Sequence, residues 1–232
     1  MRMIASFRAG HAQRFRKMAR PSPKLLVVLV AVCAVFAACA IPDARRVLLQ
    51  AAGRSLVGED PAEPVDVIVI SVDAKGAGVL EAADLVRRNL ATRVAVFSDS
   101  PKRINQEFKT RGVEYYDPPA LAARQLKALG VSVVERIPST VDGTENEGLL
   151  LSQWCEQNAF QSIIFVSTPD HSHRTQRVMR RSMSGHRTRV LVRFSRYSDF
   201  DPDNWWSTRD GARIGIVEFE KLLLDVLSHP FS

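Results

Sequence analysis

A histidine and an arginine three residues apart, His171 and Arg174, are the clearest candidates for chemistry in this sequence. Imidazole exchanges protons near neutral pH, and guanidinium binds anionic oxygen atoms through a planar fork of N–H groups. On a helix, residues three apart lie on the same face, so both side chains can reach one ligand. Asp170 precedes them and is predicted to contact the ligand, with an ordinary helix N-cap as the alternative. A solvated helix end is the non-functional alternative for the pair.

Thr144 and Glu147 form a second candidate pair with the same spacing. A threonine at a helix start, followed three residues later by glutamate, matches the capping box, which is a purely structural motif. The functional alternative places Glu147 at the edge of a ligand crevice, where its carboxylate orients His171 or activates a water molecule. Thr144 would then offer its hydroxyl to the ligand. Both interpretations stay open here, and we predict His171 and Glu147 as the catalytic residues.

Residue spacing disfavours three other chemistries. Asp170, His171 and His173 lack the spacing of paired metal ligands, because helical residues two apart point about 200° away from each other. Residues 76–78 (Gly-Ala-Gly) lack the full glycine pattern of a dinucleotide-binding loop. Cys155 has no catalytic cysteine signature around it and is predicted to be a small buried apolar residue. We therefore expect neither a metal ion nor an organic cofactor.

The hydrophobic pattern predicts alternating strands and helices that position these residues. Short continuous apolar runs indicate strands buried on both faces, as in a parallel sheet that helices cover. Such runs lie at residues 65–70, 94–97, 131–137, 163–166 and 190–194. Segments with helical spacing lie at residues 79–90, 118–129, 145–158, 171–183 and from 205 onward. The predicted fold class is α/β with a mostly parallel sheet.

Polar residues follow four of these strands, which is a second argument for a site. They are Ser71 and Asp73, Ser98 and Asp99, Ser139 and Thr140, and Thr168 and Asp170. The carboxyl ends of parallel strands meet at one edge of a sheet, and ligands of open α/β sheets bind in the crevice there. A helix N-terminus at that edge favours an anion. We predict an anion-binding crevice whose ligand-binding residues are Arg174, Thr144, Ser98, Asp73 and Asp170.

The net charge of +7 comes from the N-terminal flank of the chain. Residues 1–24 contain seven Lys and Arg and no acidic residue, and without them 25 basic residues balance 25 acidic ones. This distribution disfavours nucleic-acid binding. The seventeen residues 25–41 are all apolar or cysteine, which reaches the short end of a membrane span. The preceding cations place the N-terminus in the cytoplasm and the rest of the chain on the far side of the membrane.

Two alternatives to an uncleaved transmembrane helix stay open for this segment. A signal peptide is cleaved after small residues, and Ala37 with Ala38 supplies such a site. Residues 36–39 (Phe-Ala-Ala-Cys) are also similar to a bacterial lipoprotein cleavage box, which would leave Cys39 lipidated. We predict the uncleaved anchor, with a basic cytoplasmic leader at residues 1–24, a linker at 42–64 and the α/β domain at 65–232.

Several motifs together resemble the YdcF/SanA/ElyC-like family of bacterial proteins. They are Ser139-Thr140, Gly143-Thr144-x-x-Glu147, residues 163–167 followed by His171-x-x-Arg174, Trp205-Trp206-x-x-Arg209-x-Gly211, and Glu218-x-x-Lys221. The resemblance covers residues 65–228 of the chain. It implies a three-layer α/β/α Rossmann-like sandwich, an N-terminal anchor in the inner membrane with a periplasmic domain, and a role in cell-envelope biogenesis.

The resulting hypothesis is a membrane-anchored envelope protein that binds an anionic, phosphate-bearing metabolite such as a lipid-carrier phosphate, and acts on it as a hydrolase or transferase. Arg174 would bind the anion and His171 would transfer protons. The alternative is a non-catalytic binding or regulatory module of envelope synthesis. Family members usually carry a glycine-rich turn after the first strand, whereas this chain has Ser-Val-Asp-Ala-Lys-Gly at residues 71–76. That departure favours the alternative, as does Ser98-Asp99 where the family has a second glycine-containing turn.

Overall fold

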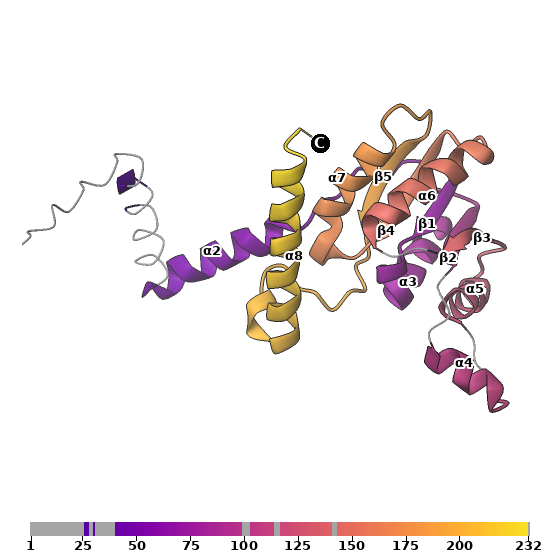
Figure 1. The fold of residues 1–232 in the computed structure, drawn as a ribbon, viewed down its shortest axis with the longest axis horizontal. Coiled ribbons are helices and arrows are strands. Elements are labelled where there is room, and N and C mark those ends of the chain that lie inside the picture. Colours follow the sequence, from indigo (N-terminus) through magenta and orange to yellow (C-terminus); the bar gives the residue numbers. More distant parts are fainter. Residues whose placement is uncertain are drawn as a thin grey trace, which may run out of the picture. The chain divides into compact units, whose positions relative to one another are not determined.

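A parallel sheet forms the centre of the structure, a computed structural model that describes residues 26, 27, 30, 40–98, 103–113, 117–140 and 143–231. Within these residues, five strands pair in the order β3-β2-β1-β4-β5 (Figure 1). They are β1 (Val67–Ile70), β2 (Arg93–Ser98), β3 (Val133–Thr140), β4 (Ser162–Ser167) and β5 (Arg189–Phe194). The predicted α/β class with a parallel sheet is confirmed, and the strand order is that of a Rossmann-like fold.

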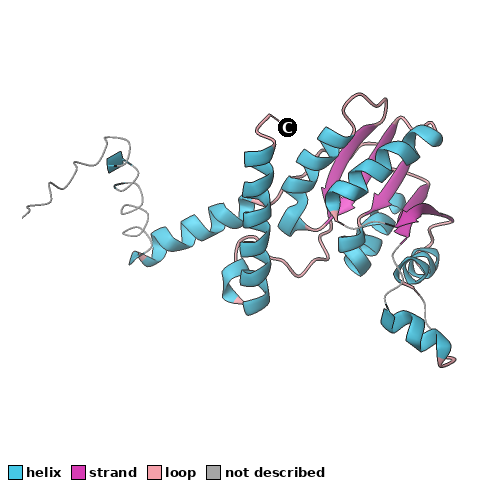
Figure 2. Cartoon of the chain, in the orientation of Figure 1, coloured by secondary structure: helices cyan, strands magenta, loops and turns pink. Residues whose placement is uncertain are grey.

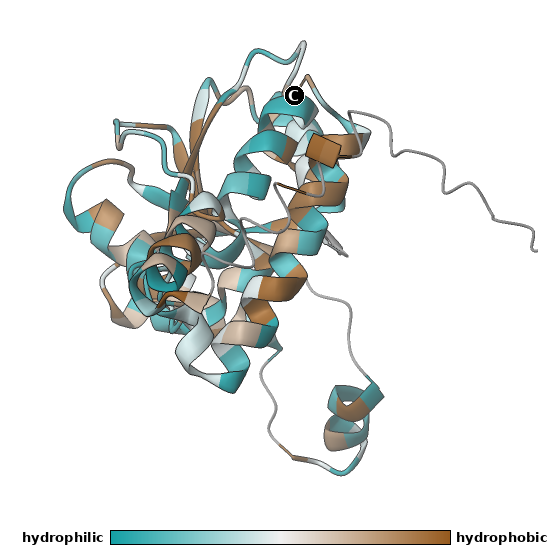
Figure 3. Ribbon diagram, turned by 90° about the vertical axis from the view of Figure 1, so that its left-hand side faces the viewer, coloured by the Kyte–Doolittle hydropathy of each residue, from teal (hydrophilic) through white to brown (hydrophobic). Residues whose placement is uncertain are grey.

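Helices cover both faces of the sheet (Figure 2). The four residues of β1 are all buried and alternate between two hydrophobic cores. Val67 and Val69 lie in the core shared with α6 (Thr144–Gln157) and α7 (Ser172–Ser182). Ile68 and Ile70 lie in the core shared with α3 (Lys75–Arg87) and α5 (Pro118–Ala128). The helices carry hydrophilic and hydrophobic residues along their length, as expected for elements with one face on a core (Figure 3).

Short helical elements connect several of these layers. The single 3₁₀ turns η1 (Val72–Ala74) and η2 (Pro169–His171) follow β1 and β4. The helix α4 (Arg103–Thr110) lies between β2 and α5. Helix α7 begins at Ser172, one residue later than predicted, because Pro169 opens η2 before it.

A third hydrophobic cluster joins the end of α2 (Pro42–Ser55) to η3 (Trp205–Ser207) and α8 (Arg209–Ser228). Leu56, Phe200 and Trp205 are its buried members. The Trp205 indole Nε1–H donates to the Leu49 carbonyl at 2.8 Å. A Cβ atom on Gly53 would lie 2.0 Å from the Pro202 carbonyl oxygen, so only glycine fits this close approach.

The segment predicted as a linker is packed along the α/β domain. The Asp60 N–H donates to the Val192 carbonyl of β5 at 2.9 Å, and the Val192 N–H donates to the Asp60 carboxylate at 2.8 Å. Residues from Arg46 onward belong to the same compact unit as the sheet. The start of this segment is held by the hydrophobic cluster that α2 and Leu56 form with Phe200, Trp205 and α8.

The predicted transmembrane segment, residues 25–41, lies almost wholly outside the described residues, which include only Leu26, Val27, Val30, Ala40 and Ile41 of it. No helix in the described part of the chain is long and apolar enough to cross a membrane. The chain divides into two compact units, Met1–Arg45 and Arg46–Ser232, and the sheet belongs to the second. The anchor and its orientation stay predictions.

Candidate functional site

The candidate site lies where the order of the strands reverses. From β1 the chain proceeds outward to β2 and β3, then returns to β4 on the other side of β1. At the carboxyl ends of β1 and β4, the Ser71 N–H donates to the Val166 carbonyl at 2.9 Å. Ligands of doubly wound α/β proteins bind at such a point because two loops diverge there and leave a crevice.

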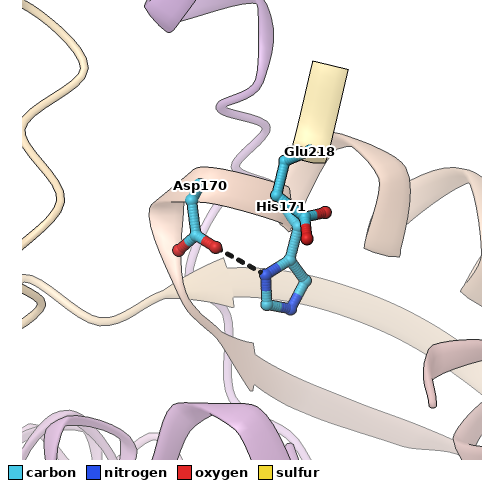
Figure 4. A group of neighbouring side chains, drawn as sticks. All are labelled: Asp170, His171 and Glu218. Atoms are coloured by element: carbon cyan, nitrogen blue, oxygen red, sulfur yellow. Dashed lines mark hydrogen bonds and ion pairs between the residues drawn. The ribbon is translucent and has the colours of Figure 1, made fainter. Parts of the chain in front are cut away.

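His171 is held at this point by the turn that follows β4. Its Nδ1 atom lies 3.0 Å from Asp170 Oδ2 (Figure 4). The same atom lies 3.1 Å from Thr168 Oγ1. Its Nε2 atom is buried, lies 4.0 Å from Asp73 Oδ2, and has no hydrogen-bond partner among the described residues. Asp170 thus accepts the Nδ1 proton and leaves Nε2 free for proton exchange. The N-cap alternative for Asp170 is wrong, because Thr168 and His171 are the capping residues of η2 and α7.

Asp170 also sets the protonation of His171. Burial acts to lower the pKa of His171, but the hydrogen bond and negative charge of Asp170, aided by the charge of Glu218, raise it by more. The net pKa of His171 therefore lies above its ordinary value, and the imidazolium form is favoured. Burial likewise acts to raise the pKa of Asp170, and the interactions with His171 outweigh it and lower that pKa.

Glu147 approaches the same point from the first turn of α6. Its Oε1 atom accepts hydrogen bonds from the Val72 N–H at 2.7 Å and from the Ser71 hydroxyl at 3.0 Å. The capping-box alternative is wrong, because the N-cap of α6 is Gly143 and its first residue is Thr144. Gly143 has φ = 83°, a left-handed conformation that favours glycine over threonine at the cap.

Burial makes Glu147 a titrating group near neutral pH. Its burial raises the pKa to about 7, against the hydrogen bonds from Val72 and Ser71 that lower it. The negative charge of Asp73 adds to the rise, and the charge of His171 opposes it. A carboxyl group with this pKa can accept a proton at neutral pH more effectively than an ordinary glutamate. Sequence reasoning placed Glu147 correctly at a helix start but could not supply its pKa.

Arg174 is already engaged with a carboxylate of α8. Its Nη2 and Nε atoms donate to Glu218 Oε2 at 3.1 and 3.4 Å. Lys221 Nζ donates to the other oxygen of Glu218, Oε1, at 2.6 Å. The predicted role of Arg174 as an anion ligand stays a prediction. Sequence reasoning noted the Glu218-x-x-Lys221 motif in the resemblance but did not assign either residue to the site.

The remaining predicted residues occupy different positions around this centre. Ser98 donates its hydroxyl hydrogen to the Ile137 carbonyl at 2.8 Å, beside the register shift between β2 and β3. Thr144 is buried in the first turn of α6. Asp73 is the most exposed acidic group near His171, with 59% of its side chain accessible. Asp99 lies outside the described residues.

The turn after β1 has little capacity to cradle a phosphate group. The Val72 N–H is bonded to Glu147, and the Asp73 N–H is bonded weakly to the Ser71 hydroxyl at 3.4 Å. Lys75 stands at φ = 44° and ψ = −136°, a conformation that glycine adopts without cost. The chain therefore keeps a turn geometry suited to glycine while it uses the backbone donors internally.

Three side chains offer atoms that a metal ion could share. One atom from each of Asp170, His171 and Glu218 lies within 4.8 Å of the other two (Figure 4). A cation would have to replace the Asp170–His171 bond and compete with Arg174 and Lys221 for the carboxylate of Glu218.

Comparison with protein-family models, with curated proteins and with solved structures finds no match to this chain. The resemblance to the YdcF/SanA/ElyC-like family stays a prediction from the motifs.

Proposed function

We propose that this protein binds an anionic, phosphate-bearing metabolite at the carboxyl edge of the sheet and hydrolyses it, or transfers its phosphoryl group, with His171 and Glu147 as the acid–base pair. One observation carries the proposal. The Nε2 atom of His171 is buried without a partner among the described residues, while Asp170 and Thr168 hold Nδ1. A buried polar atom left unpaired is costly, and such groups concentrate where a ligand completes the hydrogen bonding.

The two groups have protonation states suited to complementary roles. Glu147, with a pKa of about 7, is partly ionised at neutral pH and accepts a proton from an attacking water molecule. The raised pKa of His171 favours protonation, and the protonated ring donates its Nε2 proton to the oxygen of the leaving group. The water oxygen bonds to phosphorus as the bond to the leaving oxygen breaks. In a transfer reaction an acceptor hydroxyl takes the place of water.

The cellular setting of the proposal comes from the N-terminal part of the sequence. Seven basic residues precede the seventeen-residue apolar run, which favours an inner-membrane anchor with the α/β domain in the periplasm. A domain held at that membrane surface would encounter lipid-carrier phosphates of envelope biogenesis. These compounds are the substrate class that we propose, in agreement with the motif resemblance.

A non-catalytic binding or regulatory module is the second candidate. The observation that favours it is the turn after β1, whose Val72 and Asp73 N–H groups are used inside the protein. A binder needs fewer donors to the phosphate than an enzyme that must stabilise a transition state.

The test measures phosphate release by the full chain in mild detergent, with a panel of sugar phosphates, nucleotides and lipid-carrier phosphates. His171→Ala should lower turnover of the active compound by about 10²- to 10⁴-fold. His173→Ala is the matched control, because His173 lies two residues further and bonds to the Ser55 carbonyl away from the site. Binding in a calorimeter without any release by the wild-type protein would support the second candidate. Neither binding nor release would refute both.

A further inference from the structure

Glu218 pairs with Arg174, the side chain that the proposed function assigns to the anion. Both Arg174 nitrogens that face Glu218 donate to a single oxygen, Oε2, while Lys221 holds the other oxygen. The side chains of Arg174 and Glu218 are 14% and 9% exposed, whereas that of Lys221 is 50% exposed. The carboxylate therefore has one buried partner in the site and a second partner at the surface.

We propose that Glu218 is an internal counter-ion of Arg174 that an anionic ligand displaces, with Lys221 retaining the carboxylate after the exchange. The inference rests on the proposed function, because it assigns the anion to Arg174. Glu218 is then a positioning residue: without ligand it keeps the guanidinium in place beside His171, and with ligand it moves toward Lys221.

The physical basis is the cost of an unpaired charge in a partly buried place. An arginine with 14% side-chain exposure is expensive to leave without a counter-charge, so a site that awaits an anion needs an occupant. The same cost applies to the Glu218 carboxylate once the ligand has displaced it from Arg174. Lys221, three residues further along α8, removes this second cost because its contact with Oε1 does not involve Arg174. A neutral ligand cannot drive the exchange, so the arrangement selects for negative charge.

A second ion cluster between the same two helices supplies a matched control. Asp225 of α8 accepts hydrogen bonds from Arg177 and Arg181 of α7, at 2.5 and 2.9 Å. This cluster also pairs basic side chains with a carboxylate of α8, but it contains neither His171 nor any residue of the turn after β1. Removal of its negative charge should not affect a ligand at the carboxyl edge.

The experiment measures binding of inorganic phosphate to the full chain by isothermal titration calorimetry. Glu218→Gln keeps the size of the side chain and removes the competing charge, so phosphate affinity should rise roughly ten- to hundredfold, the worth of one charge-assisted contact. Asp225→Asn should bind phosphate like the wild-type protein. Arg174→Gln in the Glu218→Gln background should lose the gain. An NMR titration of the His171 imidazole gives a second reading, because loss of the Glu218 charge should lower the pKa of His171.

Each outcome decides between the two proposals. A gain in phosphate affinity that occurs in Glu218→Gln but not in Asp225→Asn, and that Arg174→Gln reverses, supports the exchange. Unchanged or weaker phosphate binding by Glu218→Gln overturns it, and the proposed function then survives if the wild-type protein still binds phosphate. Equal gains in phosphate affinity for Glu218→Gln and Asp225→Asn would mean that the gain comes from the net charge of the protein. This result overturns the exchange as well. Absence of phosphate binding in every variant overturns both proposals.

Discussion

The two ion clusters between α7 and α8 show how similar residues take different parts in one interface. At the end near β4, Glu218 pairs with Arg174 and Lys221, and it lies near His171, whose buried Nε2 atom has no partner among the described residues. Further along, Arg177 and Arg181 share the carboxylate of Asp225. The second cluster is typical of ion pairing that holds two helices together. The first has the same pairing, but it lies at the switch point of the sheet, where ligands of open α/β sheets bind.

The pKa values of the carboxyl groups separate the two regions further. Burial acts to raise the pKa of Asp225, but its hydrogen bonds to Arg177 and Arg181 outweigh burial and lower that pKa. Burial raises the pKa of Glu147 to about 7 and outweighs the hydrogen bonds from Val72 and Ser71, which act to lower it. The lowered pKa of Asp225 suits a carboxylate that stays charged and pairs with two arginines, whereas a carboxyl group that titrates near neutral pH can transfer protons.

The largest expected difference between the two regions is in turnover. His171→Ala should lower the rate on the active phosphate compound by about 10²- to 10⁴-fold, since this is the usual contribution of a general acid. Arg177→Ala, in the Asp225 cluster, should lower the melting temperature and leave the rate per folded molecule unchanged. Initial rates and thermal unfolding of the two variants make the comparison. A comparable rate loss in Arg177→Ala would show that turnover depends on the interface as a whole.

The next effect is a pH-dependent gain in stability for Glu147→Gln. The folded-state pKa of Glu147 is raised above its unfolded value, so its contribution to stability is fully present below pH 4.5 and is lost as pH rises through about 7. At pH 8 the variant should exceed the wild-type protein by roughly 3 kcal/mol, the free-energy equivalent of the rise to a pKa of about 7. Denaturant unfolding at pH 4 and pH 8 measures the difference.

The contribution of Asp225 to stability should depend on pH in the opposite direction to that of Glu147. Because the pKa of Asp225 is lowered in the folded state, its stabilising contribution is present above the ordinary carboxyl pKa and is lost as the solution becomes acidic. Asp225→Asn should therefore be less stable than the wild-type protein at pH 7, and the gap should close at low pH. A gap for either variant that does not change with pH would mean that packing, and not ionisation, sets its stability.

A smaller effect is expected on anion affinity. Arg174→Ala should weaken phosphate binding roughly ten- to hundredfold, because a charge-assisted contact is worth about 1.5 to 3 kcal/mol. Arg174→Lys should recover part of this loss, since an ammonium group cannot reproduce the guanidinium fork. Arg181→Ala should change little, because Arg181 is bonded to Glu145 and Asp225 away from the site. Equal losses at Arg174 and Arg181, measured by calorimetry, would indicate a diffuse basic surface.

The smallest effect concerns backbone strain in the turn after β1. Lys75 has a positive φ of 44°, which costs a residue with a Cβ atom about 1 kcal/mol or more. Lys75→Gly should therefore raise the free energy of unfolding by about 1 kcal/mol. Gly76→Ala is a useful comparison, because a Cβ atom there meets nothing within 4 Å and the backbone is not in the left-handed region. A loss of stability in Lys75→Gly would show that the lysine side chain compensates for its strain.

Much of the fold followed from local pattern. The runs around Ile68 and Phe165 were predicted as strands because they are apolar without interruption, and both residues are fully buried in the parallel sheet. Boundaries were less accurate. Strand β1 begins at Val67 and not at Val65, because the Asp66 carboxylate accepts the Gln161 and Ser162 N–H groups at the entrance to β4. Helix α3 begins at Lys75, four residues earlier than predicted, since η1 leads directly into it.

Two features could be predicted from spacing along the chain: polar side chains follow the strands, and His171 and Arg174 lie at one end of a helix. The sequence could not determine their partners. Glu218 lies 44 residues beyond Arg174, and Glu147 lies 76 residues beyond Ser71. Only the tertiary structure brings these groups within hydrogen-bond distance, and ionisation and charge pairing depend on that distance and on burial. For the same reason a motif that fits a capping box became a buried carboxyl group that titrates near neutral pH.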